Sequence, residues 1–240
     1  MIPRYIGEQI IVSKETWSEV VEVISDYWDG GFLITDFDYG DGHYIVVLSK
    51  VVGWTRQCIL YGSEFPEYKV DDAWENGLYI TNVLHDGCDW IVIMTSMSDC
   101  VGQRWITHTD WNSFKRRVDS AMDDGMIVTK IACSQNYPTT YCAVASVMDY
   151  SQAQRLRFYP GMPTPDMIDL CTRDTVLIDM NDVDGGIVAL TASDTGWDDQ
   201  KLLAGNWRRV IEYIEEGWEH GYRVTTLCYS AGYWVVAMSY

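Results

Sequence analysis

A glutamine recurs along the whole chain at nearly even intervals, and this period constrains the fold more than any other feature of the sequence. The gaps between successive glutamines are 48, 46, 51 and 46 residues. The positions are Gln9, Gln57, Gln103, Gln154 and Gln200. Self-similarity at such a period is the signature of supersecondary units that stack on one another. The 240 residues therefore predict five similar units.

The clearest unit begins with a predicted helix at residues 17–28. Its apolar residues follow the i, i+3, i+4, i+7 spacing that gives a helix one buried face. Thr16 and Glu19 have the spacing of a capping box before this helix. Gly30 and Gly31 suit its end, where a left-handed residue costs least for glycine. Tryptophans open and close several of the helices, and we expect them to fill the seam between helix and sheet.

Three strands are expected after the helix, at 32–39, 44–49 and 57–61. The turn at 40–42 contains Asp-Gly, which predicts that the first two strands form a hairpin. A Gly-x-x-(Ile/Val)-Thr entry to the first of these strands recurs at 31–35, 77–81, 125–129 and 221–225. The fourth unit matches the repeat poorly. We expect a short helix at best in 162–171, and the segment 175–178 lacks the Gly and Thr of the Gly-x-x-(Ile/Val)-Thr entry.

The chain ends inside a strand, at 234–240, with no third strand after it. The missing strand is expected at 8–13, beside the C-terminal hairpin, because ring closure removes exposed sheet edges. The predicted fold is α/β, a single domain forming a closed five-bladed α/β propeller of βαββ units, with helices outside and strands lining the axis. An open solenoid is the alternative, but neither end has the polar character of a cap. The expected boundaries are 14–61, 62–107, 108–159, 160–205, and 206–240 closed by 8–13.

Charge and cysteine content narrow the classes of partner and compartment. The formal net charge is −18, which disfavours nucleic acid and anionic membranes as partners. Seven cysteines without metal-like spacing predict a reduced, cytoplasmic protein. No signal peptide is expected, because residues 1–5 lack a basic segment followed by an apolar one, and no apolar run is long enough to span a bilayer. Oligomeric state is left open.

The segments that carry the repeat resemble a known but uncharacterised domain. Residues 31–50 resemble the repeat GYxITxxxYGxGxWxVVMSK, and 53–57 and 64–66 resemble its GxTxQ and xFP segments. Residues 221–225 and 234–239 are nearly as similar. Such repeats occur C-terminally in plant casein-kinase-1-like kinases and beside caspase-like and kinase domains in bacteria. The resemblance implies an accessory recognition or regulatory module and brings no catalytic residues. At fold level the unit order is also similar to the pentein fold, an analogy that implies no chemistry.

Two sets of side chains are candidate binding residues. The five glutamines would tie each inner strand to a neighbour's backbone or, alternatively, line a ligand site at the axis. The second set is the aromatic residues of the loops before the glutamines, which form a crown for a partner or pack over the adjacent unit. These residues are Tyr5, Trp54, Tyr150 and Trp197.

No metal, cofactor or catalytic residue is predicted. The acidic segments 36–42 and 181–185 lack the full calcium-loop pattern and are explained by turn chemistry. A pentein-type hydrolase would need a reactive cysteine with a histidine, but none of the possible residues lies in a recognisable motif. These are Cys133 and Cys228 with His43, His85, His108 or His220.

The function favoured by the sequence is that of a non-enzymatic recognition or scaffold module, which binds a protein partner or a small ligand on one face of the ring. Two alternatives stay open. One is a pentein-like hydrolase or transferase acting on a guanidino or amide substrate, and the other is a sponge or sensor for a small signalling molecule.

Overall fold

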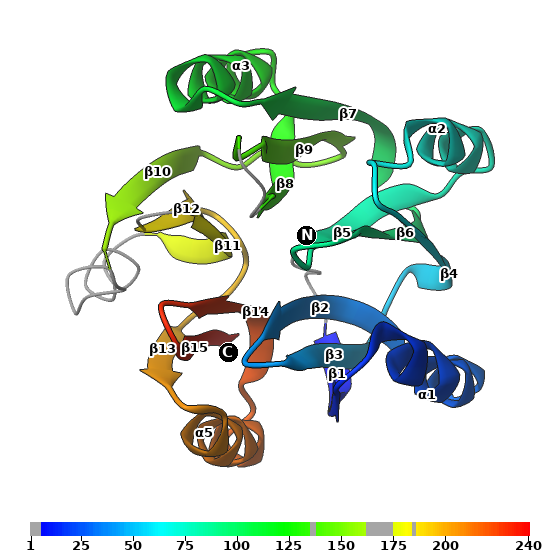
Figure 1. The fold of residues 1–240 in the computed structure, drawn as a ribbon, viewed down its shortest axis with the longest axis vertical. Helices are drawn as coiled ribbons and strands as arrows, with labels where there is room; N and C mark the ends of the chain where they lie inside the picture. The colour runs from blue at the N-terminus through cyan, green and yellow to red at the C-terminus, as the bar shows by residue number, and fades with distance from the viewer. Residues whose placement is uncertain (1–5, 135–137, 162–174, 184–185) are drawn as a thin grey trace.

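The computed structural model describes residues 6–134, 138–161, 175–183 and 186–240. Within these residues the chain forms five three-stranded antiparallel sheets and four helices. Figure 1 shows the sheets arranged around a central axis with the helices on the outside, a propeller-like arrangement. We call each sheet, together with its helix where one is described, a blade.

The first blade shows how the sequence builds the unit. Strand β1 (Ile6–Lys14) leads into helix α1 (Trp17–Asp29), which the Thr16–Glu19 capping box begins as expected. Gly31 follows the helix with φ +78°, a left-handed conformation that favours glycine. Strands β2 (Leu33–Gly40) and β3 (His43–Val51) then form the predicted hairpin.

The other blades repeat this order. The second blade comprises β4 (Trp54–Gly62), α2 (Glu67–Glu75), β5 (Tyr79–His85) and β6 (Trp90–Met97), and the third comprises β7 (Cys100–His108), α3 (Trp111–Asp123), β8 (Ile127–Cys133) and β9 (Tyr141–Met148). The fourth comprises β10 (Gln154–Pro160), β11 (Val176–Val183) and β12 (Gly186–Ala192). The fifth comprises β13 (Gln200–Gly205), α5 (Trp207–Glu219), β14 (Arg223–Ser230) and β15 (Tyr233–Ser239). The short helix expected at 162–171 lies outside the described residues.

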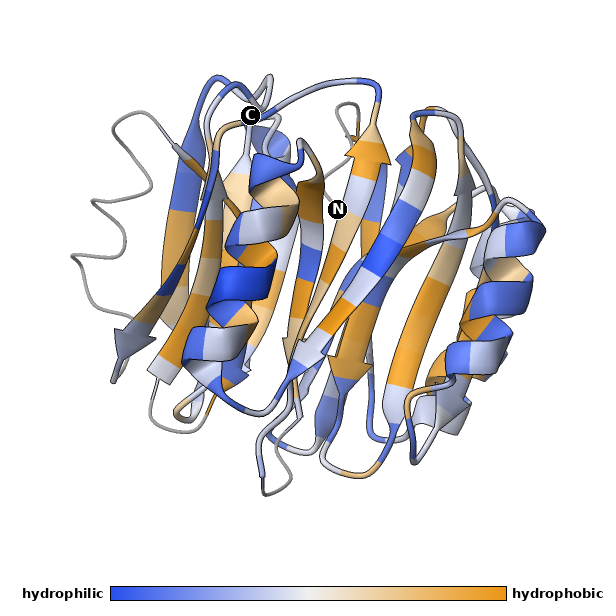
Figure 2. Cartoon of the chain, turned by 90° about the horizontal axis from the view of Figure 1, so that it is seen from above, coloured by the Kyte–Doolittle hydropathy of each residue, from blue (hydrophilic) through white to orange (hydrophobic). Residues whose placement is uncertain are grey.

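The first hairpin strand of each blade faces the axis. Strand β2 contacts β5, β5 contacts β8, β8 contacts β11, β11 contacts β14, and β14 contacts β2. Each described helix packs on its own sheet, and the same apolar cluster continues to the sheet of the next blade, as where Ile24 of α1 shares a cluster with Ile91 and Ile93 of β6. Figure 2 shows the strands standing side by side with hydrophobic segments along them and helices at the rim.

The pairing of the N-terminal strand differs from the prediction. Residues 8–13 were expected beside 234–239, but β1 pairs with β3 of its own blade, with Gln9 opposite Ser49 and Val12 opposite Val46. Strand β15 pairs instead with β13 and β14. Each glutamine strand therefore belongs to the blade of the helix that follows it. The sheets span 6–51, 54–97, 100–148, 154–192 and 200–239, one strand out of phase with the expected boundaries.

The physical reason is that the glutamine strand and its helix form one crossover unit. Helix α1 packs on β1 and β3, so the strand that feeds the helix shares the same hydrophobic layer. Strands β3 and β4 are neighbours in the chain but belong to different sheets. Val52 and Gly53, which link them, carry the chain to the next blade. Gly53 takes φ +87° to make this step.

Candidate functional site

Each repeated glutamine spans the seam between two blades. The amide oxygen of Gln57 accepts from the backbone N–H of Ile34 (2.8 Å), and its amide nitrogen donates to the carbonyl of the same residue (2.8 Å). The nitrogen also donates to Thr95 Oγ1 in its own blade (3.0 Å), and Trp28 Nε1 of the preceding helix donates to the oxygen (3.3 Å). The side chain is thus used as both donor and acceptor. The pattern recurs as a backbone pair between Gln103 and Ile80, Gln154 and Val128, Gln200 and Leu177, and Gln9 and Val224.

The Gln9 contact lies between the first and the last blade. Gln9 accepts from Val224 N–H (2.7 Å) and donates to the Val224 carbonyl (2.9 Å). Trp218 Nε1 of α5 donates to the same amide oxygen (3.0 Å), as Trp28 does for Gln57. The N-terminal segment therefore meets the C-terminal blade through a side chain rather than through a shared sheet. These bonds are the structural use of the glutamines; a ligand role for them stays a prediction.

The threonine landmark has a partner in the same network. Thr35 is the extra residue of a β-bulge in β2, and its hydroxyl lies 2.7 Å from Ser49 Oγ, to which Gln9 also donates. Equivalent hydroxyl pairs form between Thr81 and Thr95, Thr129 and Ser146, and Thr225 and Ser239. In the fourth blade the corresponding bulge residue is Ile178, and the residue opposite Gln154 is Ala192. The fourth blade therefore has neither hydroxyl of this pair.

The residue after each bulge points a polar group at the axis. The five residues are Asp36, Asn82, Lys130, Asp179 and Thr226, all buried. Lys130 Nζ lies 2.9 Å from Asp36 Oδ1 and 2.8 Å from Asp179 Oδ1. Burial alone would lower the pKa of Lys130, but the charges of Asp179 and Asp36 outweigh it and raise that pKa. Asn82 Nδ2 donates to the Thr35 carbonyl (2.8 Å), whereas Asn82 Oδ1 has no hydrogen-bond partner among the described residues.

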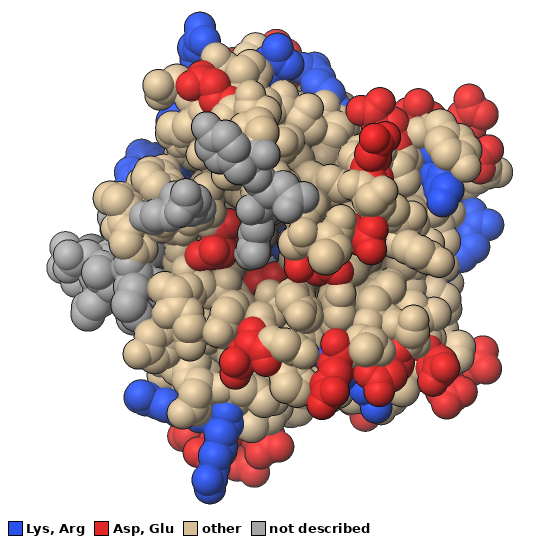
Figure 3. Space-filling model, viewed as in Figure 1, with Lys and Arg blue, Asp and Glu red and all other residues tan. Residues whose placement is uncertain are grey.

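A second acidic group follows two residues along β2. Asp38 Oδ2 accepts from Tyr229 N–H (2.7 Å) of the last blade, and burial raises the Asp38 pKa to about 7 against the pull of that bond. Asp36 and Asp38 lie inside β2, as the expected strand 32–39 implies, so turn chemistry does not explain these two carboxylates; the turn itself holds Asp41 and Gly42. Figure 3 shows acidic side chains gathered around the centre of the face it presents.

Three of the four predicted crown residues lie on the face where loops pass from one blade to the next, which we call the interblade-loop face. Trp54 is 8% exposed and packs with Leu33 and Met97 between two blades, the packing alternative. Tyr150 and Trp197 are half-buried, and Tyr5 lies outside the described residues. Exposed apolar residues that sequence reasoning missed are Val52 (81%) and Val101 (72%) on the same face. Val52 lies in the link between β3 and β4 and Val101 at the start of β7, and neither position gives a periodic signal that could have indicated it.

A pocket of ≈ 520 Å³ opens on this face at the seam between the first and last blades. Its apolar lining comes from Ile6, Val51, Val52 and Trp197. The two cationic side chains of its lining, Lys50 and Arg223, have partners within the protein. Lys50 pairs with Glu8 at 2.9 Å, and the Arg223 guanidinium donates to the carbonyls of Gly7 (2.6 Å) and Tyr222 (2.7 Å). The pocket therefore offers an apolar surface held in place by a fixed polar frame.

The candidate nucleophiles are poorly activated. Burial, strengthened by nearby carboxylates, raises the pKa of Cys228 well above its ordinary value, and the thiol donates to the Tyr229 carbonyl. Burial likewise raises the pKa of the Cys133 thiol, and it lowers the pKa of His85. His43 and His220 are exposed. Within the described ranges, no group of three or more acidic, cysteine or histidine residues could hold a metal, and no helix is long and apolar enough to cross a membrane.

Comparison with known proteins places the chain in a family without giving it an activity. No curated protein matches the sequence. The family model described as "Domain of unknown function (DUF7477)" matches residues 7–155. That match covers the first three blades and stops at the start of β10, where the worn fourth blade begins. The chain belongs to this family, DUF7477.

Proposed function

We propose that this protein is a non-enzymatic recognition module that binds a partner protein through its interblade-loop face. The observation that carries the proposal is the pocket between the first and last blades, with Trp197 and Val52 in its lining. Val52 leaves most of its side chain in water, and Val101 does the same at the start of β7. Tryptophan is enriched among the residues that carry the binding energy of protein interfaces, and Val52 adds apolar surface beside it.

The pocket chemistry favours an apolar side chain of the partner over a charged ligand. Lys50 pairs with Glu8, and Arg223 donates to two backbone carbonyls, so both cations already have partners within the protein. The rest of the lining is apolar and suits an apolar group entering between Val52 and Trp197. The resemblance of the repeat to regions beside kinase and caspase-like domains agrees with an accessory role.

The enzymatic alternative lacks support from the thiols. Five described cysteines have a raised pKa for which burial is the first cause, and a thiol that stays protonated at neutral pH is a weak nucleophile. The six described cysteines are all free, which supports a reducing compartment such as the cytoplasm.

We also infer that the five blades form a closed α/β propeller in solution. The contact of β14 with β2 and the Gln9–Val224 bonds support closure. They have the geometry of the seams between blades that are consecutive in the chain. Closure matters for function because the pocket lies at this seam and needs both of its walls.

Affinity purification from the native host tests the proposed function. The bait is the 240-residue chain, compared with Val52→Asp and with the control Tyr68→Asp. Tyr68 is 74% exposed on α2 and does not line the pocket, so this control adds the same charge elsewhere. We expect a protein that is retained by the wild type and the control and lost with Val52→Asp. If every retained protein is indifferent to Val52 and to Trp197→Ala, the interblade-loop face is not the binding surface.

A further inference from the structure

The third blade carries a basic groove on the outer rim of an otherwise acidic protein. A pocket of ≈ 510 Å³ lies between strand β7 and helix α3. Its polar lining comes from both elements: Arg104 and His108 from the strand, and Ser113, Arg116, Arg117 and Ser120 from the helix. Figure 3 shows lysines and arginines gathered at this edge of the molecule. Their position far from the interblade seam makes this groove independent of the function proposed above.

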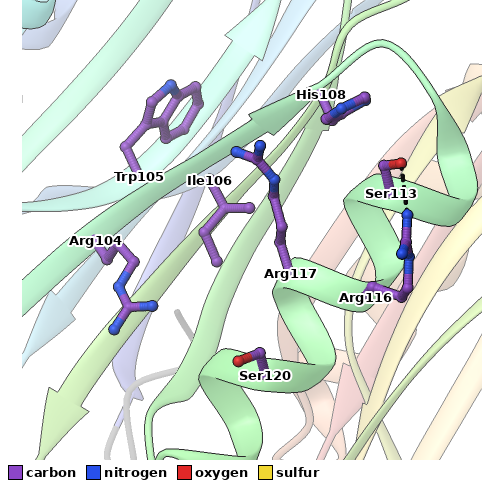
Figure 4. Close-up of a pocket in the computed structure, with 8 residues that line it drawn as sticks. All are labelled: Arg104, Trp105, Ile106, His108, Ser113, Arg116, Arg117 and Ser120. Atoms are coloured by element: carbon purple, nitrogen blue, oxygen red, sulfur yellow. Dashed lines mark hydrogen bonds between the residues drawn. The ribbon is translucent and has the colours of Figure 1, made fainter.

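The spacing of these residues places them on two facing surfaces. Ser113, Arg116, Arg117 and Ser120 follow i, i+3, i+4, i+7 along one side of α3. Arg104 and His108 share one face of β7 with Ile106 between them. Figure 4 shows Arg117 reaching from the helix toward the strand and Arg116 turned beside Ser113. The groove is therefore a cleft with cations on both walls and an apolar floor.

The arginines are available for an external anion. Arg116 bonds the Asn112 carbonyl (3.3 Å) and Ser113 Oγ (3.0 Å) and pairs with no carboxylate among the described residues. Arg117 makes no hydrogen bond or ion pair within the part of the chain that the structure describes. Arg104 lies 3.7 Å from Asp124, a pair exposed to solvent and therefore weak. His108 Nδ1 accepts from Asp110 N–H (2.8 Å), so its other ring nitrogen carries the proton as a donor.

Two other helices carry no arginine at the positions equivalent to Arg116 and Arg117. When the helices are aligned on the tryptophan that opens each, Arg116 corresponds to Glu22 in α1 and Glu212 in α5. Arg117 corresponds to Val23 and Tyr213. The fold thus forms without a cation at either position, so it does not require the arginine pair of the third blade.

We propose that this groove binds a phosphate monoester. Two guanidinium forks without a carboxylate partner and an imidazole N–H are the kind of donors that recognise a dianionic tetrahedral oxyanion. The net charge of −18 opposes a polyanion such as nucleic acid, whereas a single phosphoryl group needs only the local field of the groove. The group comes either from a phosphorylated side chain or from a small phosphate ester, and the two are separated by experiment.

Isothermal titration of the full chain tests the site with inorganic phosphate, phenyl phosphate and a phosphoserine peptide, each against its unphosphorylated counterpart where one exists. The test variant is Arg116→Gln/Arg117→Gln. The matched control is Arg208→Gln/Arg209→Gln, which removes the same charge from adjacent residues of α5. Circular dichroism and thermal melting establish that both variants fold.

We expect saturable binding of a phosphate probe that weakens about tenfold or more in the test variant, the effect of losing charge-assisted hydrogen bonds, and stays within about twofold in the control. Tighter binding of the peptide than of inorganic phosphate assigns the site to a phosphorylated partner; equal binding assigns it to small anions. Absence of saturable binding by every probe, or equal losses in the two variants, overturns the proposal. None of these outcomes depends on Val52, so the site and the proposed function fail separately.

Discussion

The substitution Gln9→Ala tests whether the first and last blades meet in solution. It removes four hydrogen bonds: two to Val224, one to Ser49 and one from Trp218. The side chain is 8% exposed, so water has little access to replace them. At about 1 kcal/mol net for each bond, the expected loss in the free energy of unfolding is about 4 kcal/mol. Such a loss is a large part of the roughly 5–15 kcal/mol that stabilises a native protein.

Gln57→Ala is the matched comparison. Gln57 is also 8% exposed and also makes four hydrogen bonds, but it ties blades that are consecutive in the chain. Urea denaturation followed by tryptophan fluorescence gives the free energy of unfolding for both variants. Exposed Glu22→Ala serves as a surface control, with an expected change within about 0.5 kcal/mol.

In a closed ring the two glutamine variants lose similar stability, because both seams must break when the protein unfolds. If the ring is open at the terminal seam, the Gln9 bonds are absent and only Gln57→Ala is destabilised. A Gln9→Ala protein within about 0.5 kcal/mol of the wild type, beside a strongly destabilised Gln57→Ala, would refute the argument for closure.

Three further predictions concern the axis and the thiols. Lys130→Met leaves Asp36 and Asp179 buried without their cation, and we expect a loss of about 3–5 kcal/mol in urea denaturation; a change below about 1 kcal/mol contradicts a buried ion pair. The folded protein holds the Asp38 proton up to about pH 7, whereas the unfolded chain releases it near 3.8, so this group makes stability fall as pH rises through that window. Asp38→Asn should flatten that slope in denaturation curves collected at several pH values, and an unchanged slope excludes Asp38 as its source. Among the described cysteines, a thiol reagent should label exposed Cys88 first in the native protein, as mapped by mass spectrometry, and early labelling of Cys228 would revive the enzymatic alternative.

Local patterns predicted the elements but not the phase of the repeat. The capping box of α1 and the hairpin turn at Asp41-Gly42 are decided by neighbouring residues, and both are confirmed. The pairing of β1 depends on contacts distant in the sequence. In a cyclic repeat every glutamine strand has a hairpin before it and a helix after it, so the alternation of side chains is the same for either partner. The helix decides between them, because it carries β1 into the hydrophobic layer of the hairpin that follows.

The polar residues at the axis could have been predicted from the sequence. The residue after each threonine landmark is polar within an otherwise apolar strand, as at Asp36, Asn82 and Lys130. Comparing that position across the units indicates one shared environment. The basic groove has a similar signal, since the third helix places Arg116 where two other helices place glutamate. Its concave shape could not be predicted, because it requires the distance between helix and strand.

The glutamine contacts carry a consequence for how such a chain drifts over evolutionary time. Each amide reaches main-chain atoms of its neighbour, which exist whatever residue stands there. Gln200 therefore still docks on Leu177 although the fourth blade has exchanged its hydroxyl pair for Ile178 and Ala192. Replacing both partners of a buried polar pair by apolar groups is close to neutral, whereas replacing one is costly. A single unit can thus diverge beyond recognition while its neighbours remain under the original constraint, and the divergence is expected to proceed in coupled pairs of substitutions.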